Sequence, residues 1–305
     1  MVQVENLTYD YPSHRALHGL SFSIPTGSIT ALVGPNGAGK TTLMRCLAGL
    51  TRPLMGSIFI NNTNVLEDPR KVHRQIGFLS DFFGLYDKLT IYQALTYFAK
   101  AHEVPNNEVD KRVTSIIERL HLTDKTHADI GHLSRGMKQR VAIGQTMVHN
   151  PQFLILDEPA SGLDPEARHD LANLFKELNK DGITLLVSSH ILAELDAYSN
   201  NLVIMREGKI VDNDFFEQKN TNLRRLLLKL TKPSVDLKSI LEAEELISNI
   251  NCTETTANFD FSGTETQQAE LMMALIGKGL SVLSFAEEKV NMQDKYLDTI
   301  KQQNN

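Results

Sequence analysis

Residues 34–41 combine glycines, a lysine and a hydroxyl side chain in the order G-x-x-x-x-G-K-[ST]. The motif follows the apolar run Ile29–Val33 and opens a helical pattern over Thr41–Leu50, which is the context that phosphate binding requires. Glycines let successive backbone N–H groups point at phosphate oxygens, and the positive end of the helix adds to their field. The sequence therefore predicts a nucleotide-phosphate loop made of Gly34, Pro35, Asn36, Gly37, Ala38, Gly39, Lys40, Thr41 and Thr42.

Two side chains of this loop have expected roles of their own. We expect Lys40 to bridge the β- and γ-phosphates of a bound nucleotide and the Thr41 hydroxyl to bind Mg²⁺. The simpler alternative is a glycine turn that only joins a strand to a helix. A second motif with matching chemistry favours the nucleotide site.

That second motif is a pair of acids, Asp157 and Glu158, directly after the apolar run Phe153–Leu156. Acids at the end of such a strand lie at the edge where doubly wound sheets bind ligands. Asp157 fits a second magnesium position, and Glu158 fits the base that polarises the attacking water. His190 follows another apolar run, Thr184–Ser188, and is expected to donate to the γ-phosphate or to hold that water. Taken alone, His190 would be assigned a structural or surface role.

Short apolar runs alternate with helical patterns from the start of the chain to about Ile210. Continuously apolar strands that alternate with helices indicate a parallel sheet covered on both faces. Besides the strands already named, we expect strands at Arg74–Leu79 and Asn201–Met205 and helices at Asp110–Leu120, Arg135–Val148 and Ala167–Lys180. Two further strands, residues 2–7 and Leu20–Ile24, are expected to be antiparallel additions to that sheet.

The pattern changes near Asp212, where the mostly polar stretch Asp212–Asn222 is interpreted as a linker. Beyond it we expect strands at Leu226–Leu230, Ala257–Phe261 and Ser281–Phe285 and helices at Val235–Ala243, Glu265–Lys278 and Met292–Gln302. This order favours a small α+β sandwich of the ferredoxin-like type. We therefore predict two domains, residues 1–215 and residues 216–305.

The composition narrows the class of protein. The chain has 305 residues, of which 41% are hydrophobic and 22% charged, as in globular rather than disordered proteins. Its net charge of −6 argues against broad nucleic-acid binding, which needs a basic surface. Two cysteines are too few to suggest a disulfide scaffold or a zinc site. No run approaches the roughly 18 apolar residues of a membrane span, so any membrane role is expected to come through a partner.

Together these motifs resemble the ATP-binding cassette (ABC) family of transporter ATPases, over about residues 1–215. Residues 133–137, Leu-Ser-Arg-Gly-Met, stand where the family has its signature LSGGQ. Residues 161–164, Ser-Gly-Leu-Asp, resemble the family's D-loop, and residues 188–190 resemble its H-loop. Tyr11 stands where the family carries an aromatic residue that stacks on adenine. Tyr9 is the competing assignment, and a tyrosine that only packs on the sheet edge is a third.

The resemblance implies a fold, ligands and an assembly. The fold is an α/β P-loop NTPase cassette with a mostly parallel sheet, an antiparallel β subdomain and a helical signature subdomain. The ligands are ATP and Mg²⁺, and the assembly is a head-to-tail dimer that sandwiches two ATP molecules. The partner subunit would be a second copy of the chain or a different ABC ATPase. The resemblance also implies nucleotide-binding residues outside the phosphate loop and the acidic pair. They are Tyr11, Asp81, Asp164 and His190 from one subunit and Ser134 and Gly136 from the other.

Two departures from the family pattern matter. Arg135 and Met137 replace the first glycine and the glutamine of the signature, whereas Ser134 and Gly136 are kept. The Q-loop glutamine is missing, and Asp81 lies nearest to its position, so contact of Asp81 with Mg²⁺ or water is a hypothesis. Similar departures occur in ATPase subunits of multidrug-type and of sodium- or lipid-exporting ABC systems, which also tend to carry a C-terminal module. This favours an exporter.

The leading interpretation is the ATPase subunit of a membrane transporter, at the cytoplasmic face of the cell membrane. We expect it to pair with integral-membrane permease subunits through a surface groove near Ser80–Tyr86, and we expect no nucleic acid partner. The alternative is a soluble ABC ATPase that acts in translation or DNA repair. One phosphate loop, no long coiled coil before the signature and only two cysteines argue against that alternative.

Overall fold

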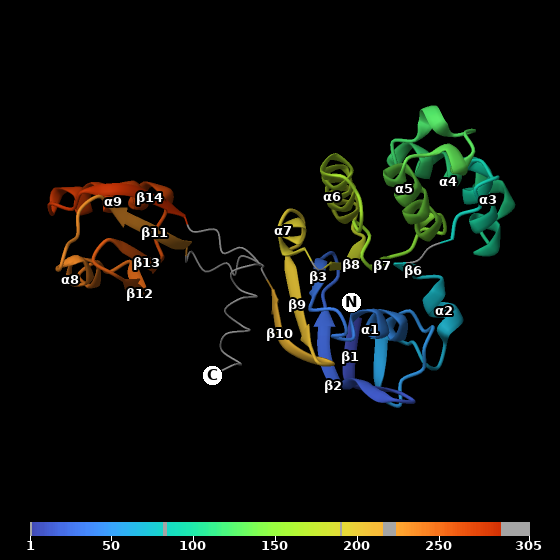
Figure 1. Cartoon of the computed structure of the whole chain (residues 1–305), viewed down its shortest axis with the longest axis horizontal. Helices are drawn as coiled ribbons and strands as arrows, with labels where there is room; N and C mark the ends of the chain where they lie inside the picture. The colour runs from blue at the N-terminus through green and yellow to red at the C-terminus, as the bar shows by residue number, and fades with distance from the viewer. Residues whose placement is uncertain (1, 82–83, 190, 216–223, 288–305) are drawn as a thin grey trace. The chain divides into compact units, whose positions relative to one another are not determined.

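The computed structural model describes residues 2–81, 84–189, 191–215 and 224–287 (Figure 1). These residues form two compact units, one within residues 2–215 and the other within residues 224–287. Each unit has a hydrophobic core of its own. Two predictions, the role of His190 and the helix Met292–Gln302, lie outside the described residues.

The larger unit is built on a six-stranded sheet in the order β10-β9-β3-β8-β7-β6. Five of its strands run parallel to their neighbours, and β10 pairs antiparallel with β9 at one edge. The strands are β3 (Ile29–Val33), β6 (Ile76–Leu79), β7 (Phe153–Leu156), β8 (Thr184–Ser189), β9 (Asn201–Arg206) and β10 (Lys209–Phe215). Every residue of β3, β7 and β8 is buried, as in a parallel sheet covered on both faces. The predicted parallel core is therefore confirmed.

A second, antiparallel sheet carries the first strands of the chain, in the order β2-β1-β4-β5. The strands are β1 (Val2–Tyr11), β2 (His14–Ile24), β4 (Met55–Ile60) and β5 (Thr63–Asn64). Val2 and Val4 are buried whereas Gln3 and Glu5 are exposed, so one face of β1 meets water. That alternation suits an antiparallel sheet and not a sheet buried on both faces. The expectation that these strands extend the parallel sheet is therefore wrong, although their antiparallel pairing is confirmed.

Helix α1 (Lys40–Leu47) begins directly after the phosphate loop and is almost entirely buried. Leu43, Met44 and Leu47 have no exposed surface. They belong to one core cluster with Val4 of β1 and Val203 of β9, which joins the two sheets. Because the whole helix is held by this core, the position of its first residues is fixed.

A helical region lies between β6 and β7 in the sequence. It consists of α3 (Ile91–Ala101), α4 (Asn106–Arg119) and α5 (Arg135–Met147), and α5 also packs against β6 (Figure 1). The sequence analysis places no helix at α3, although Thr90 and Gln93 form a capping box at its start. The remaining helices of this unit are α2 (Pro69–His73), α6 (Pro165–Lys180) and α7 (Leu192–Leu195), of which the last two pack on β8.

The segment after β9 corrects the predicted linker Asp212–Asn222. A turn at Glu207 and Gly208, both with positive φ, returns the chain along β9 as strand β10. Residues 212–215 are therefore part of the sheet, where an edge strand tolerates their polar sequence. Residues 216–222 lie outside the described residues.

The smaller unit is a four-stranded antiparallel sheet in the order β12-β13-β11-β14 with two helices. In chain order its elements are β11 (Arg224–Leu230), α8 (Leu237–Glu242), β12 (Ile247–Cys252), β13 (Thr256–Phe261), α9 (Glu265–Gly277) and β14 (Val282–Glu287). This β-α-β-β-α-β order is that of the ferredoxin-like motif. Leu226, Leu228, Phe259 and Phe261 occupy alternate positions of β11 and β13 and have no exposed surface.

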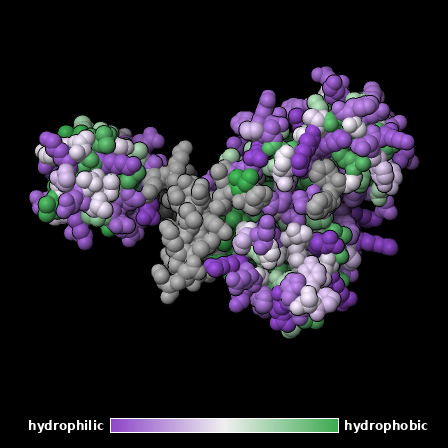
Figure 2. Space-filling model, in the orientation of Figure 1, coloured by the Kyte–Doolittle hydropathy of each residue, from purple (hydrophilic) through white to green (hydrophobic). Residues whose placement is uncertain are grey.

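The surface seen in Figure 2 is largely hydrophilic in both units, with hydrophobic residues scattered over it. Scattered apolar side chains are normal for a folded protein. Among the helices of the described residues, none has the length and apolar content of a membrane span.

Candidate functional site

The phosphate loop, the acidic pair and two aromatic residues line one cavity of about 410 Å³. Its walls come from β1 and β2, the loop before α1, the end of β6 and the turn after β7. The lining residues are Tyr11, His14, Ala16, Asn36, Gly37, Ala38, Gly39, Lys40, Thr41, Thr42, Asp81, Asp157, Glu158 and Ser161. The structure thus brings together most of the residues predicted from separate motifs.

Lys40 is the charged group at the centre of the phosphate loop. Its ammonium Nζ donates to the carbonyl oxygen of Gly34 at 2.7 Å and to that of Pro35 at 3.4 Å. Lys40 is buried, and this burial lowers the pKa of its ammonium, although Glu158 and Asp157 act in the opposite direction. Gly34 and Pro35 therefore support the lysine from behind and do not line the cavity.

Gly39 permits the turn from the loop into α1. Its φ is 99°, and a Cβ atom here would lie 2.9 Å from the carbonyl oxygen of Ala16. Only glycine adopts this backbone conformation without strain and also fits against β2. The loop is therefore pressed against the second sheet, with Lys40 as the first residue of the helix.

The two acids are joined by a hydroxyl group of the neighbouring strand. Ser188 Oγ donates to Asp157 Oδ1 at 2.6 Å and accepts a hydrogen bond from the backbone N–H of Glu158 at 2.8 Å. Asp157 is 1% exposed, whereas Glu158 is only partly buried and lines the cavity. Glu158 has a φ of 48°, an unusual conformation for this residue type. Strand β8 thus holds the carboxylate of Asp157 and the backbone of Glu158 in place.

Asp157 offers an atom that fits a divalent cation. Its Oδ2 is buried and has no hydrogen-bond partner among the described residues. Such an atom is costly to bury unless a ligand completes its coordination. The described residues contain no cluster of three or more His, Cys, Asp or Glu side chains suited to a metal. This fits Mg²⁺, which usually takes one or two protein oxygens together with phosphates and water.

Two rings form an aromatic surface at one side of the cavity. Tyr11 and His14 are stacked, with ring centroids 5.3 Å apart and an interplanar angle of 29°. Tyr11 OH also lies 3.2 Å from Thr42 Oγ1, which ties the ring to α1. Tyr9, the competing residue, does not line the cavity and packs against the core cluster.

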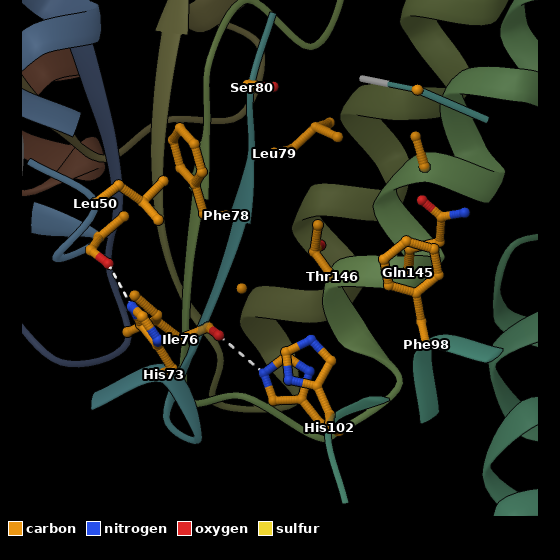
Figure 3. Close-up of a pocket in the computed structure, with 15 residues that line it drawn as sticks. Leu50, His73, Ile76, Phe78, Leu79, Ser80, Phe98, His102, Gln145 and Thr146 are labelled. Carbon is orange, nitrogen blue, oxygen red and sulfur yellow. Dashed lines mark hydrogen bonds between the residues drawn. The ribbon is translucent and has the colours of Figure 1, made fainter. Parts of the chain in front are cut away.

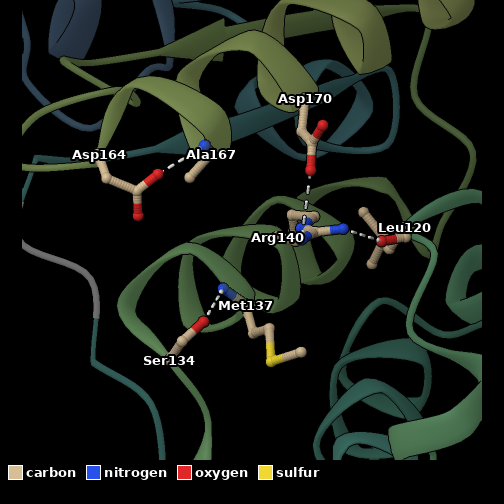
Figure 4. Close-up of polar contacts among 7 residues, drawn as sticks. All are labelled: Leu120, Ser134, Met137, Arg140, Asp164, Ala167 and Asp170. Atoms are coloured by element: carbon tan, nitrogen blue, oxygen red, sulfur yellow. Dashed lines mark hydrogen bonds and ion pairs between the residues drawn. The ribbon is translucent and has the colours of Figure 1, made fainter.

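Three predicted residues, Ser134, Gly136 and Asp164, do not line this cavity. They lie at the starts of α5 and α6, where Figure 4 shows Ser134 and Asp164. Ser134 Oγ accepts from the Met137 N–H at 3.3 Å and caps α5, and Asp164 Oδ1 accepts from the Ala167 N–H at 2.9 Å and caps α6. A Cβ at the third residue, Gly136, would lie 3.0 Å from the Cβ of Ala167, so the two helix ends are closely packed. These residues therefore do not reach the nucleotide cavity of their own chain.

Sequence reasoning missed His14, Ser161 and the bond of Ser188. His14 follows Tyr11 after a short turn, and Ser161 lies three residues after Glu158. For His14 the nearness to a predicted residue is the only signal, whereas Ser161 also begins the stretch that resembles the D-loop. The bond between Ser188 and Asp157 depends on the pairing of β7 with β8, which the sequence does not specify.

Comparison with known proteins now identifies the family. The family described as ABC transporter matches residues 17–161. The chain is 31% identical to the uncharacterized ABC transporter ATP-binding protein YxlF of Bacillus subtilis, over 98% of this chain and 99% of that protein. The chain belongs to the ATP-binding subunits of ABC transporters. This ABC ATPase subunit binds ATP and hydrolyses it to power transport, and the alternative in translation or DNA repair is thereby excluded.

Two further relatives of the ABC subunit add detail. It is 33% identical to the Nod factor export ATP-binding protein I of Rhizobium meliloti, over 68% of this chain and 62% of that protein. It also resembles the dimeric post-hydrolysis structure of the ATP-binding cassette MJ0796 bound to ADP and Pi. That match has a TM-score of 0.65 and 25% identity and covers 71% of this chain and 99% of that one.

A second cavity of the ABC subunit, of about 390 Å³, lies between β6, α3 and α5 (Figure 3). Ser80 and Gly84 line it, within the stretch predicted to contact a permease, and apolar side chains such as Phe78 and Phe98 form much of its wall. His102 and His149 stack at one end with ring centroids 3.9 Å apart. His149 Nε2 donates to the carbonyl oxygen of Ile76 at 2.8 Å, and burial lowers the pKa of His149 to about 4.

Proposed function

We propose that the 410 Å³ cavity binds ATP with Mg²⁺ and that Glu158 polarises the water that attacks the γ-phosphate. In this proposal Lys40 contacts the β- and γ-phosphates, and Thr41 and Asp157 hold the cation. The cation, when bound, would neutralise charge that develops on the phosphate oxygens. The observation that carries the proposal is the Ser188 hydroxyl, which holds Asp157 and Glu158 side by side at the cavity wall.

Lys40 is prepared for phosphate by the way it is bound in the loop. Among the described residues, the hydrogen-bond partners of its ammonium are carbonyl oxygens of the loop, at the distances given above. Phosphate oxygens carry full negative charge and would compete well for the same donors, because charge-assisted hydrogen bonds are stronger than neutral ones. Tyr11 and His14 offer a ring surface on which a nucleotide base can stack. Asp81, which is exposed at the rim, would contact the cation or its water.

The assembly that we propose is a head-to-tail dimer, with a second copy or with a different ABC ATPase. Ser134 and Gly136 lie at the start of α5, outside the cavity of their own chain, and in this dimer they would act on the nucleotide of the facing subunit. The positive end of α5 favours an anionic phosphate there. The dimeric solved relative supports this assembly, and His190 would complete the site from its own chain.

The transport step that we propose is export through separate permease subunits. The relative named for Nod factor export supports this direction. The apolar cavity between β6, α3 and α5 would receive an intracellular helix of the permease, which would place the ATPase at the cytoplasmic face of the cell membrane. An apolar groove of this size suits an amphipathic helix.

The experiment that tests the site is Glu158→Gln in the full chain, with Glu166→Gln as the control. Glu166 is an exposed acid in the first turn of α6 and does not line the cavity. We expect Glu158→Gln to bind ATP with unchanged affinity but to hydrolyse it at least 100-fold more slowly and to accumulate as an ATP-bound dimer in gel filtration. The control should retain its rate within two-fold. Normal hydrolysis by Glu158→Gln would remove Glu158 as the base.

A further inference from the structure

Arg135 is placed where its own helix does not favour a cation. It is the first residue of α5, directly after the cap Ser134, and the first turn of α5 contains no acidic residue. Cations are unfavourable at the positive end of a helix. The two other cations near this helix end have partners that explain them: Lys138 pairs with Asp87, and Arg140 donates to the carbonyl oxygen of Leu120.

The partner of Arg135 is the turn that follows the acidic pair. Its Nη2 donates to the carbonyl oxygen of Ser161 at 3.1 Å. The next residue is Gly162, with a φ of +67°, and a Cβ atom there would lie 2.3 Å from the guanidinium carbon of Arg135. The guanidinium therefore occupies the space that any side chain at position 162 would need.

From Ser161 a chain of hydrogen bonds leads through the backbone of Glu158 to the carboxylate of Asp157. The Ser161 N–H donates to the carbonyl oxygen of Glu158 at 3.1 Å. The Glu158 N–H donates to Ser188 Oγ at 2.8 Å, and Ser188 Oγ donates to Asp157 Oδ1 at 2.6 Å. Arg135 is thus the outer end of a continuous path from the start of α5 to the acids of the same subunit.

We propose that Arg135 is a positioning residue for hydrolysis: it anchors the turn at residues 158–162 and thereby holds Glu158 in place for the attacking water. The inference rests on the proposed role of Glu158 as the base. A residue with positive φ keeps that conformation only when its surroundings determine it, and here the turn is held by Ser188 on one side and by Arg135 on the other.

The role proposed for Arg135 concerns the rate of ATP hydrolysis and not the binding of ATP. Arg135 does not line the nucleotide cavity, and its contacts do not include the phosphate loop. Loss of the guanidinium should therefore lower kcat and leave the affinity for ATP unchanged. Arg135 is also exposed, so its replacement should leave the thermal midpoint of the protein nearly unchanged.

The test compares ATPase kinetics of the full-length wild type with those of Arg135→Ala, Arg135→Met and Arg135→Lys. Met keeps much of the length of the side chain without a donor, whereas Lys retains one donor that can reach a carbonyl. We expect kcat to fall about ten-fold in the Ala and Met variants, with KM for ATP within two-fold, and to be partly restored by Lys. Lys138→Ala is the matched control in the same helix and should keep full activity. Full activity of both the Ala and the Met variants, or an equal loss in the Lys variant, would overturn the proposal.

A double-mutant cycle with Gly162→Ala tests the contact itself. The strain of alanine at a positive φ is present in both backgrounds and cancels in the cycle. The collision with the guanidinium is present only in the wild-type background, so Gly162→Ala should reduce kcat less in Arg135→Ala than in wild type. Additive effects would show that Arg135 and Gly162 do not act on each other.

If Glu158→Gln is inactive while Arg135→Ala is fully active, the positioning role fails and the proposed function stands. If Glu158→Gln hydrolyses ATP normally, the proposed function itself fails.

Discussion

The Ser188 hydroxyl donates to Asp157 Oδ1 at 2.6 Å, and this bond crosses from β8 to the end of β7. Both residues are buried, with Ser188 at 0% and Asp157 at 1% exposure. A buried carboxylate oxygen without a partner would be costly, so the serine stabilises the folded protein as well as the proposed site. Fold and chemistry are linked at this point, because Ser188 Oγ also accepts a hydrogen bond from the Glu158 N–H.

Ser188→Ala should therefore weaken both stability and catalysis. We expect the free energy of unfolding to fall by about 1–3 kcal/mol, because Asp157 Oδ1 and the Glu158 N–H both lose their partner. We also expect kcat to fall at least ten-fold. Urea unfolding and ATPase kinetics measure the two effects. Ser199→Ala is the control, since Ser199 donates only to the carbonyl oxygen of Leu195 in its own turn. Unchanged stability and rate in Ser188→Ala would show that the bond has no role.

Lys40→Ala should lose affinity for ATP. Among the described residues that line the cavity, Lys40 is the only lysine or arginine, so its removal leaves the phosphates with backbone N–H groups and uncharged side chains as donors. Hydrogen bonds to charged groups contribute about 1.5–3 kcal/mol, which corresponds to a 10- to 100-fold weaker Kd. Titration with a fluorescent ATP analogue measures it. Lys176→Ala, an exposed lysine of α6, should bind as wild type. Wild-type affinity in Lys40→Ala would contradict the phosphate-loop assignment.

Asp81→Ala tests the residue nearest the missing Q-loop glutamine. Asp81 is exposed and lines the cavity, so contact with a cation or its water predicts a slower ATPase and a higher Mg²⁺ concentration for half-maximal rate, each by about three-fold or more. A Mg²⁺ titration of the ATPase rate, with and without the permease, measures both. Asp87→Ala is the control, because Asp87 pairs with Lys138 and lies outside the cavity. If rate and Mg²⁺ requirement are unchanged, the hypothesis for Asp81 is rejected.

The parallel core was predictable because its strands are largely apolar. β3 and β7 have the predicted bounds, since Ile29–Val33 and Phe153–Leu156 are buried on both sides and end abruptly at polar turns. β12 was missed because its sequence, Ile-Ser-Asn-Ile-Asn-Cys, mixes polar and apolar residues without regular alternation. The last residues of β10, 212–215, were predicted as part of a linker because their sequence is mostly polar. Their pairing with β9 makes them a strand, and the sequence alone does not show that pairing.

The site was predictable where a motif is local and obscure where it depends on tertiary contacts. Lys40 and Thr41 follow from one short stretch of sequence, and Asp157 and Glu158 follow from a strand end. The cap roles of Ser134 and Asp164 also have a local signature, because serine and aspartate are preferred directly before the first turn of a helix. The bond from Arg135 to Ser161 joins residues 26 positions apart and has no signature in the sequence.

Removal of the C-terminal part tests the predicted boundary between residues 1–215 and 216–305. A chain ending at Lys219 keeps every residue that lines the nucleotide cavity and the whole core cluster of the larger unit. We expect it to fold and to bind ATP with the affinity of the full chain, measured by analogue titration and by thermal unfolding. Lys40→Ala in the shortened chain serves as the non-binding control. Loss of ATP binding on truncation alone would show that the boundary is wrong.

His149 should make the stability of the protein depend on pH. Burial is the main cause that lowers its pKa to about 4, and the neighbouring His102, whose pKa burial also lowers, adds to it. The ordinary pKa of histidine is about 6.5, so between about pH 6.5 and pH 4 the unfolded chain binds a proton that the folded protein does not. The stabilising contribution is therefore complete above about pH 6.5 and is lost as the pH falls to about 4, by about 3 kcal/mol in all.

His149→Gln tests this dependence. The variant loses the titrating ring and the bond to Ile76, so it should be less stable than wild type at pH 7 but lose less stability between pH 7 and pH 5. His132→Gln, which replaces an exposed histidine, should keep the wild-type slope. Urea unfolding at pH 7, 6 and 5 gives the free energies. Because the imidazole stacks on His102 at the end of the second cavity, protonation of both rings would place two cations with ring centroids 3.9 Å apart. An equal slope in wild type and His149→Gln would assign the pH dependence to other groups.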